Sequence, residues 1–358
     1  MRTAIIGCGF IGNIHAQAVK YLGHTIALVI DSSEQKAKDF ARNWNADGFG
    51  VSFPMALEED IQCVHICTPP ALHYSMVKDA LNSDKHVICE KPLCLYSDEG
   101  KDLVNIAHER NLVNAVNFNV RFYDACQQAK NFISSPNFGR ICLIHGSYLQ
   151  EFHALPDEYS WRYKPEFAGP MRATTEIGSH WIDLVRFLTG LEIAEVSANF
   201  GKFTPNRFVE NGIMYSESKD NSKKLIVETE DAAVISIRFS NAAIGNLLLS
   251  EVSHGRNNRL SIEVTGTKQS IWWNSEDPYR LCTSHKLSGV RVQTNAFGGG
   301  FQNTFKAFFK EAYQDIELAR PSQNPTYPTF YDGYVNAVDC TAVYESANNN
   351  SAWVKVKY

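Results

Sequence analysis

The chain has 358 residues, enough for two domains of ordinary size. Hydrophobic residues make up 44% of it and charged residues 20%, which favours a folded globular protein over a disordered one. The formal net charge is -5, from 34 basic and 39 acidic residues, so nucleic acid is not expected as a partner.

The sequence shows no sign of export or of a membrane anchor. A strand-like segment follows Met1 at once, without the charged and apolar regions of a signal peptide. No run of about 18 apolar residues occurs. The nine cysteines are therefore expected to be reduced thiols, and we predict a soluble, cytoplasmic protein without membrane contact.

A glycine-rich motif follows the first expected strand, residues 3–6. The motif reads Gly7-Cys8-Gly9-Phe10-Ile11-Gly12. A helix from Asn13 and a second strand over residues 25–30 complete a βαβ unit, the context in which this motif binds a dinucleotide. Gly7 allows the tight turn, Gly9 the approach of the pyrophosphate, and Gly12 close packing of the helix. We expect the loop, Phe10 and Ile11 included, to contact the cofactor at the helix N-terminus.

Asp31 follows the second strand at about 20 residues from the glycines, where an acid can bind the ribose hydroxyls. Its carboxylate would repel a 2′-phosphate, and Ser32 and Ser33 offer no arginine to hold one. The sequence therefore predicts NAD in preference to NADP.

Strands and helices continue to alternate as far as residue 116. Strands are expected at residues 62–68, 85–89 and 112–116, with helices at 72–81 and 98–110 between them. This alternation predicts an α/β fold, with an N-terminal Rossmann domain built on a doubly wound parallel sheet. Ligands bind such sheets at the carboxyl ends of the strands, where Thr68, Glu90 and Lys91 stand.

Cys63, His65 and Cys67 alternate along one of these strands and so share one face. A tetrahedral metal site would need a fourth ligand, and three ligands in a row on one strand are too far apart. We therefore expect no metal here and interpret the three as a buried strand face beneath a helix.

The regular alternation ends near residue 121. A helix at residues 123–134 and strands at 139–146, 234–239, 245–252, 260–264 and 270–273 are expected. They predict a C-terminal α+β domain with a large open, mostly antiparallel sheet and helices on one face. Residues 201–224 and 283–300 are expected to be long mobile connections, and the aromatic helix from Phe301 to be core. The expected boundaries are 1–121 for the first domain and 122–358 for the second.

The motifs in the first half resemble those of the Gfo/Idh/MocA family, which includes glucose–fructose oxidoreductases and inositol dehydrogenases. Besides the glycine loop, the resemblance is carried by Glu90-Lys91-Pro92 and by Thr68-Pro69-Pro70-Ala71-Leu72-His73. It implies that Thr68, Pro69, His73, Glu90 and Lys91 line the nicotinamide end of the site, and that Lys91 is catalytic. The ammonium of Lys91 could stabilise a developing alkoxide.

The resemblance extends through the second half, where Trp161 and Arg162 match a segment near the nicotinamide. It implies a C-terminal sheet that forms homodimers or homotetramers, with a small sugar or polyol as the substrate. We also expect Asn119 to contact both cofactor and substrate.

A helix with an apolar stripe is expected from residue 177, and Glu176, His180 and Asp183 stand at i, i+4 and i+7 beside that stripe. Members of the family show an aspartate where this chain has Glu176, and they use the histidine in proton transfer. We predict His180 as general base, Glu176 as the residue that orients it, and Asp183 with Asn119 as ligands of neighbouring hydroxyls.

The sequence thus predicts an NAD(P)-dependent sugar or inositol-type dehydrogenase that passes hydride between a secondary alcohol and nicotinamide. Two other functions remain compatible with it. One is an NAD-dependent glycosidase in which oxidation is transient, and the other is a non-catalytic dinucleotide-binding regulator. Fold analogy does not choose the sugar or cyclitol, the carbon that is oxidised or the direction of the reaction.

Overall fold

The computed structural model describes residues 1–158 and 160–358, which form two compact units. Unit 1 consists of Met1–Phe122 and Gly299–Ala337, and unit 2 of Tyr123–Gly298 and Val338–Tyr358. None of the helices in the described ranges is both long and apolar enough to cross a membrane.

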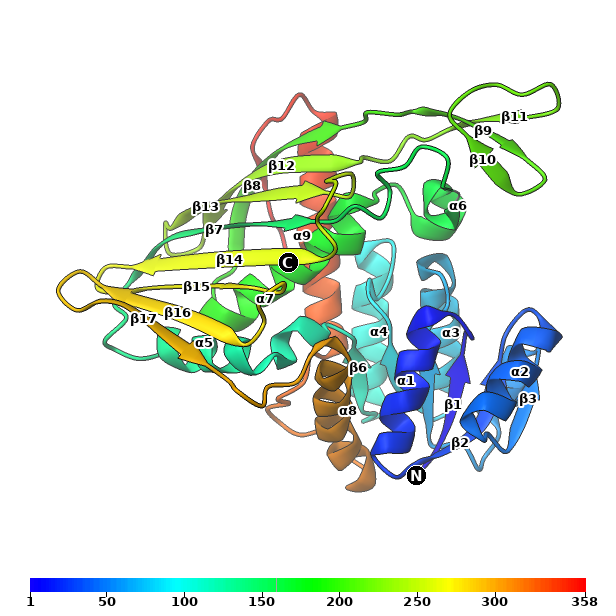
Figure 1. The fold of residues 1–358 in the computed structure, drawn as a ribbon. Helices are drawn as coiled ribbons and strands as arrows, with labels where there is room; N and C mark the ends of the chain where they lie inside the picture. Colours follow the sequence, from blue (N-terminus) through cyan, green and yellow to red (C-terminus); the bar gives the residue numbers. More distant parts are fainter. Residues whose placement is uncertain (159) are drawn as a thin grey trace. The chain divides into compact units, whose positions relative to one another are not determined.

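Unit 1 is a six-stranded parallel sheet with helices on both faces (Figure 1). Its elements are β1 (Arg2–Ile6), α1 (Phe10–Tyr21), β2 (Thr25–Ile30), α2 (Glu34–Trp44), β3 (Gly48–Gly50), β4 (Cys63–Ile66), α3 (His73–Asn82), β5 (His86–Cys89), α4 (Ser97–Glu109), β6 (Asn114–Val116) and α8 (Phe301–Glu317). The strand order is β3-β2-β1-β4-β5-β6, with every neighbouring pair parallel. The predicted doubly wound sheet is confirmed, and the strand order reverses between β1 and β4, where such folds bind dinucleotides.

Both faces of the sheet are buried at its inner strands, and apolar residues occupy successive positions of β1, β2 and β5. Ile5 and Ile88 pack in one cluster with residues of α1 and α8. Their neighbours Ile6 and Val87 pack in the other cluster, with residues of α3 and α4. Such unbroken apolar runs are typical of parallel strands covered on both sides.

Helix α8 belongs to unit 1, although the sequence analysis expected residues 122–358 to form one domain. Its aromatic stripe explains the difference. Phe305, Phe308, Phe309 and Tyr313 are buried in the same cluster as the inner residues of α1 and β1, so this face completes the core of unit 1. The expectation that the stripe is core is confirmed.

Unit 2 is built on a nine-stranded mixed sheet in the order β17-β16-β15-β14-β7-β13-β12-β8-β18. Its strands are β7 (Ile141–Leu149), β8 (Ile193–Gly201), β12 (Ala232–Phe239), β13 (Ile244–Ser250), β14 (Arg259–Gly266), β15 (Ser270–Asn274), β16 (Arg280–His285), β17 (Gly289–Thr294) and β18 (Val354–Lys355). Its helices are α5 (Asp124–Ile133), α6 (Pro165–Ala168) and α7 (Ser179–Thr189), and the long helix α9 (Phe330–Asn348) contributes residues to both units. Only β7 and β13 pair in parallel among the described strands of this sheet, which confirms the predicted, mostly antiparallel sheet.

One face of this sheet is covered and the other is open. In β12, Ala233, Ile235 and Ile237 are buried, whereas the alternating residues Val234 and Arg238 are exposed. This period of two is typical of an antiparallel sheet with helices on a single face, and α5 and α7 contact the strands there.

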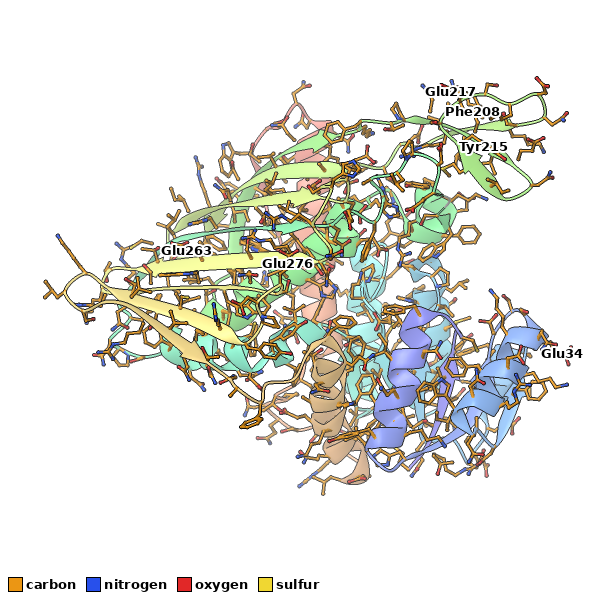
Figure 2. The ribbon with its side chains drawn as sticks, in the orientation of Figure 1. Glu34, Phe208, Tyr215, Glu217, Glu263 and Glu276 are labelled. Carbon is orange, nitrogen blue, oxygen red and sulfur yellow. The ribbon has the colours of Figure 1, made fainter. Side chains whose placement is uncertain are left out.

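Two segments expected to be mobile connections contain strands instead. Residues 201–224 hold most of a small three-stranded sheet, β9 (Asn206–Glu210), β10 (Ile213–Tyr215) and β11 (Lys223–Ile226). Phe208 pairs with Tyr215 in it (Figure 2). Residues 283–300 contain β17, whose side chains are all exposed. Neither segment shows a long apolar alternation, so periodicity could not reveal strands this short or this exposed.

Candidate active site

The glycine loop connects β1 to α1 at the carboxyl end of the unit 1 sheet. Gly7 has a φ of 101°, and a Cβ there would lie 2.6 Å from the carbonyl oxygen of Cys67. A Cβ at Gly12 would overlap the carbonyl oxygen of Gly7. Both positions therefore require glycine for the protein's own packing.

Gly9 differs from the other two glycines because neither its backbone conformation nor its packing requires a glycine. Its φ is -79°, which any residue can adopt, and a Cβ there would meet no atom within 4 Å. It is the N-cap of α1, whose first-turn N–H groups are the usual partners of a phosphate. The open space above Gly9 is thus where a pyrophosphate fits.

Asp31 follows β2 beside this loop, and its carboxylate is held by the backbone. Oδ2 accepts the N–H of Cys8 at 2.9 Å, and Oδ1 accepts the N–H of Ser33 at 3.0 Å. Each oxygen retains a lone pair for a further donor. An oriented, partly exposed carboxylate here suits the two hydroxyls of a ribose and disfavours a 2′-phosphate.

His73 connects two of the loops that the sequence analysis assigned to the nicotinamide end. The ring is fully buried, with Nδ1 2.7 Å from the carbonyl oxygen of Pro92 and Nε2 2.8 Å from that of Thr68. Burial lowers its pKa. The side chain therefore holds the loops after β4 and β5 in a fixed relation. Pro69, next to Thr68, begins the turn that leads into α3.

Glu90 and Lys91 directly follow β5, and the Lys91–Pro92 peptide is cis. Oε1 of Glu90 lies 3.0 Å from Nε2 of His15 and also accepts the side-chain amide of Asn117. Oε2 accepts the backbone N–H of Lys91 at 3.2 Å. Burial alone would raise the pKa of Glu90, but these hydrogen bonds and the charge of Lys91 hold it below its usual value.

Asn119 lies in the short helical segment Asn119–Phe122 after β6. Its side chain is buried, and the amide nitrogen donates to Oγ1 of Thr304 at 2.8 Å. One donor of Asn119 is thus used inside unit 1.

The other predicted site residues belong to unit 2, around the beginning of α7. Glu176 lies in a π-helical turn, Thr174–Gly178, that precedes α7. The expected α-helical stripe of three residues is therefore wrong for Glu176, because a π-turn shifts its side chain away from α-helical spacing. His180 and Asp183 do lie on α7, with Asp183 buried and His180 half-buried. π-turns of this kind occur frequently at functional sites.

Arg162 holds the Glu176 carboxylate, with Nε 3.0 Å from Oε2. The guanidinium also stacks over the ring of Trp161, 4.5 Å from its centroid. The negative charge of Glu176 raises the pKa of Arg162. Trp161, Arg162 and Glu176, which the sequence analysis named separately, thus form one contact group in unit 2.

A buried charge cluster that the sequence analysis did not anticipate supports the π-helical turn. The carboxylate of Glu230 accepts the backbone N–H groups of Arg172 at 3.1 Å and of Thr174 at 2.7 Å. The guanidinium of the fully buried Arg172 binds the carboxylate of Asp231 and lies 3.3 Å from that of Glu251. In the sequence these acids stand near the ends of strands, and no pattern of spacing indicates that they contact Arg172.

Burial shifts the pKa values of two groups in this region, Glu251 and His153. Burial raises the pKa of Glu251 to about 8, although the charge of Arg172 opposes the shift. Burial and the neighbouring arginines lower the pKa of His153 to about 3. Near neutral pH, His153 is neutral and Glu251 is largely protonated.

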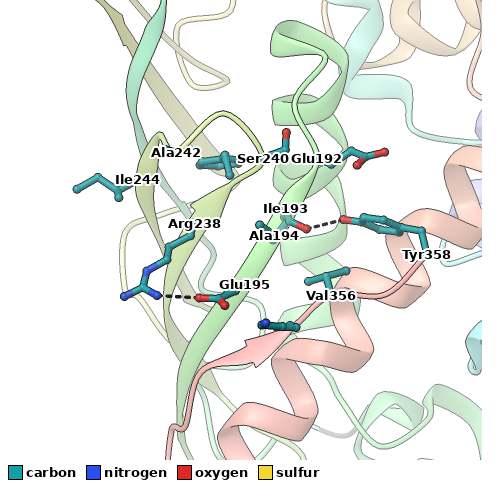
Figure 3. A pocket seen from close by; sticks show the side chains of 12 residues that line it. Glu192, Ile193, Ala194, Glu195, Arg238, Ser240, Ala242, Ile244, Val356 and Tyr358 are labelled. Carbon is teal, nitrogen blue, oxygen red and sulfur yellow. Dashed lines mark hydrogen bonds and ion pairs between the residues drawn. The ribbon is translucent and has the colours of Figure 1, made fainter.

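A pocket on unit 2 lies apart from all of these residues, along β8 and β18 (Figure 3). Arg238 pairs with Glu195 there at 2.7 Å, and the hydroxyl of Tyr358 donates to the carbonyl of Ile193 at 3.0 Å. Its lining contains no predicted site residue. Within the described ranges, no group of three or more His, Cys, Asp or Glu side chains is arranged to hold a metal ion.

Models of known protein families match segments of both units. Residues 1–118 match the model described as the oxidoreductase family with an NAD-binding Rossmann fold, and residues 126–272 match the GFO/IDH/MocA C-terminal domain. The chain belongs to the Gfo/Idh/MocA family. It is an NAD-dependent oxidoreductase, and the resemblance seen in the sequence is confirmed.

Relatives within the family align over nearly the whole chain. A levoglucosan dehydrogenase of Pseudarthrobacter phenanthrenivorans is 29% identical over 389 aligned residues, which cover 99% of this chain and 98% of the relative. An inositol 2-dehydrogenase of Saccharopolyspora erythraea is 28% identical and covers 98% and 94%. A solved levoglucosan dehydrogenase in complex with NADH and levoglucosan matches with a TM-score of 0.91 and 28% identity, over 100% of this chain and 99% of that one.

The residues of this family member fit the NAD that its Rossmann unit binds. The space above Gly9 would receive the pyrophosphate, and the oriented carboxylate of Asp31 would bind the adenosine ribose. Lys91 stands on the same carboxyl edge of the sheet as the loop, where ligands of doubly wound folds bind.

Proposed function

We propose that this protein oxidises a secondary alcohol of a sugar, cyclitol or related polyol to a ketone, and catalyses the reverse reaction. The relatives named above act on levoglucosan and inositol, which are compact ring polyols. Bound NAD supplies the hydride acceptor. The residues of the protein must then bind the alcohol, remove its hydroxyl proton and stabilise the negative charge on oxygen.

The observation that carries the proposal is the setting of Lys91. It follows β5 at the carboxyl edge of the sheet, and its backbone N–H is anchored by the Glu90 carboxylate. Lys91 would donate a hydrogen bond to the reacting hydroxyl oxygen and stabilise the developing alkoxide. The low pKa of Glu90 keeps a negative charge beside the lysine.

A histidine would supply the proton acceptor. We assign His180 as the general base, since imidazole titrates near neutral pH. Glu176, fixed by Arg162, would orient the imidazole, and its longer side chain suits a carboxylate carried on a π-helical turn. Asp183 and Asn119 would bind hydroxyls next to the reacting carbon.

The test is NADH formation, followed by absorbance, with purified protein, NAD and a panel that includes levoglucosan, L-sorbose and myo-inositol. Lys91→Ala and His180→Ala should each lower kcat by about a hundredfold or more, because each removes a group that acts on the reacting hydroxyl. The Kd for NAD, measured by fluorescence titration, should stay within about twofold of wild type. Wild-type activity in both variants would overturn the assignment.

The same panel separates the other two functions considered from the sequence. An NAD-dependent glycosidase would release sugar from a glycoside while the NADH signal returns to its starting value. A regulator would bind NAD and neither reduce it nor cleave a glycoside. Either result would replace the dehydrogenase proposal.

The open face of the unit 2 sheet supports a homodimer or homotetramer. Leu143 pairs with Ile244 and Val234 with Leu248, so all four side chains lie on the exposed face. Exposed apolar residues on one face of a sheet are common in subunit interfaces. Light scattering after gel filtration should give a multiple of 40.2 kDa, and Ile244→Asp with Leu248→Asp should give the monomer. A monomeric wild type would refute the interface.

A further inference from the structure

We propose that Tyr313, His65 and His15 form a positioning chain that fixes the proton arrangement at Glu90 and so orients Lys91. The three residues lie between the unit 1 sheet and the layer of α1 and α8, and none of them was assigned a function above. The inference rests on the proposed role of Lys91 in the reaction.

The positioning chain of hydrogen bonds is continuous and buried from solvent. The hydroxyl of Tyr313, on α8, lies 2.6 Å from Nε2 of His65, on β4. Nδ1 of His65 lies 3.0 Å from Nδ1 of His15, on α1, and Nε2 of His15 lies 3.0 Å from Oε1 of Glu90. His15 and His65 are 0% exposed and Tyr313 is 2% exposed.

The ends of the chain determine the direction of its hydrogen bonds. The ionised Glu90 can only accept, so His15 must carry a proton on Nε2. In the proposed arrangement Nδ1 of His15 accepts, and His65 donates to it from its own Nδ1. Burial holds the pKa of His65 well below its usual value, so Nε2 of His65 is unprotonated and accepts the hydroxyl proton of Tyr313. Each group in this arrangement then has a suitable partner.

The surroundings make any other proton arrangement costly. The rings of Phe305 and Phe309 lie edge-on to His15, with centroids 5.7 and 4.7 Å away, and Phe309 also contacts His65 at 5.0 Å. An unpaired polar atom in such a dry, aromatic setting loses its hydrogen bond without compensation from water. The Tyr313 hydroxyl, at the far end, donates to the unprotonated Nε2 of His65 and so stabilises the tautomers that Glu90 requires.

The chain acts on Lys91 through the two oxygens of one carboxylate. His15 and Asn117 hold Oε1 of Glu90, which leaves Oε2 directed at the backbone N–H of Lys91. If His15 adopted the other neutral tautomer, its unprotonated Nε2 would face the carboxylate and repel it. Glu90 would then rotate or take up a proton, and the backbone N–H of Lys91 would lose this acceptor. His15, His65 and Tyr313 are thus positioning residues for the lysine.

The first measurement is ¹⁵N NMR of the histidine rings in the wild-type protein, which needs no substrate. The 11 histidines make assignment necessary, and His15→Gln and His65→Gln variants would identify the two signals. We expect His15 protonated on Nε2 and His65 on Nδ1 at neutral pH. Protonation of His65 on Nε2, or a doubly protonated His65, would overturn the proposal.

The second measurement compares Tyr313→Phe with a matched control, Tyr327→Phe. Tyr327 is also buried in the core of unit 1, but its hydroxyl donates to Asp315 at 2.7 Å and does not join the chain. With levoglucosan or myo-inositol as the alcohol, Tyr313→Phe should lower kcat by about tenfold, the effect of one lost buried hydrogen bond, while KM stays within about twofold. Tyr327→Phe should leave kcat unchanged.

The two variants also distinguish an error in the positioning-chain hypothesis from an error in the proposed function. Equal kcat values for Tyr313→Phe and Tyr327→Phe would refute the positioning chain and leave the dehydrogenase intact. Absence of NADH formation by the wild type would refute the proposed function, whereas the tautomers measured by NMR would still test the chain. A redistribution of the His65 tautomer in Tyr313→Phe, absent from Tyr327→Phe, would support it independently of turnover.

Discussion

The two units bury polar groups in opposite ways. In unit 1 they form a line of hydrogen bonds that runs from Tyr313 through His65 and His15 to the negatively charged Glu90, beside the ligand edge of the sheet. In unit 2 the buried groups form a closed cluster, in which Arg172 faces two carboxylic acids and most of the charge is cancelled locally. The hydrogen bonds of the line orient the Glu90 carboxylate at its end, whereas the ion pairs of the cluster stabilise the fold of unit 2.

The difference matches the roles that we propose for the two units. Unit 1 has to present a loop, a carboxylate and a lysine to a charged cofactor, so its polar atoms are oriented but left with capacity to bind. Unit 2 has to hold Glu176 on a π-helical turn, and Glu230 does so by accepting two backbone N–H groups at the start of that turn. Variants of the two polar networks should therefore fail differently, through the orientation of groups around Glu90 in unit 1 and through stability in unit 2.

The largest effect is expected from Arg172→Met. Removal of the guanidinium leaves Asp231 buried without its cation, and breaking a buried ion pair in this way costs about 3–5 kcal/mol. Calorimetry should show a large fall in Tm. Arg238→Met is the control, because the Arg238–Glu195 pair is exposed and should contribute less than about 1 kcal/mol. Similar Tm values for the two variants would show that the cluster does not support unit 2.

The next test uses two glycines of one loop. Gly12→Ala forces a Cβ onto the carbonyl oxygen of Gly7 and should destabilise the protein by about 1–3 kcal/mol, as overpacking does. Gly9→Ala meets no protein atom, so Tm should barely change while NAD binding weakens. Thermal unfolding with and without NAD separates the two outcomes. If Gly9→Ala bound NAD normally, the pyrophosphate would not approach this residue.

Asp31→Asn should have a smaller effect, on cofactor preference alone. The amide keeps the shape of the side chain but removes the negative charge, so kcat/KM for NAD should fall about tenfold while that for NADP rises. Asp39→Asn, on the exposed surface of α2, is the control for a lost charge. An unchanged ratio of the two cofactors would show that Asp31 does not determine the preference.

Local patterns in the sequence were sufficient to predict structural features that depend on neighbouring residues. The glycine loop, Asp31 and the strand face of Cys63 and His65 all follow from spacing within a single βαβ unit or a single strand. The helix start shows the limit of this reasoning, because α1 begins at Phe10 and not at Asn13. Helix boundaries depend on the cap, and glycine is a weak signal for one.

The features that the sequence did not reveal depend on contacts between distant segments. His65 and Tyr313 are 248 residues apart, and Arg172 and Asp231 are 59 apart, so neither pair belongs to any local period. The π-helical turn at Glu176 was also hidden, since it depends on Glu230, which lies on another segment. Helix α8 illustrates the same point, because its aromatic stripe predicted a buried helix but not which core it enters.

The smallest effect expected is a change in the pH dependence of stability in Glu251→Gln. In the wild type, the pKa of Glu251 is raised from 4.5 to about 8 by burial, so the folded state binds more protons than the unfolded state in this range. Stability contributed by Glu251 is therefore complete below pH 4.5 and is lost as the pH rises through about 8. His153 has the opposite sign, since its pKa is lowered from 6.5 to about 3, and its contribution is complete above pH 6.5.

The window from about pH 6.5 to 8.5 thus isolates Glu251 from His153. Wild-type Tm should fall by a few degrees across it, whereas Glu251→Gln, which resembles the protonated acid, should show a flatter profile. The control variant Glu217→Gln changes an exposed glutamate of unit 2 and should retain the wild-type slope (Figure 2). If Glu251→Gln kept that slope as well, Glu251 would be ionised in the folded state, and Arg172 would neutralise two carboxylates at once.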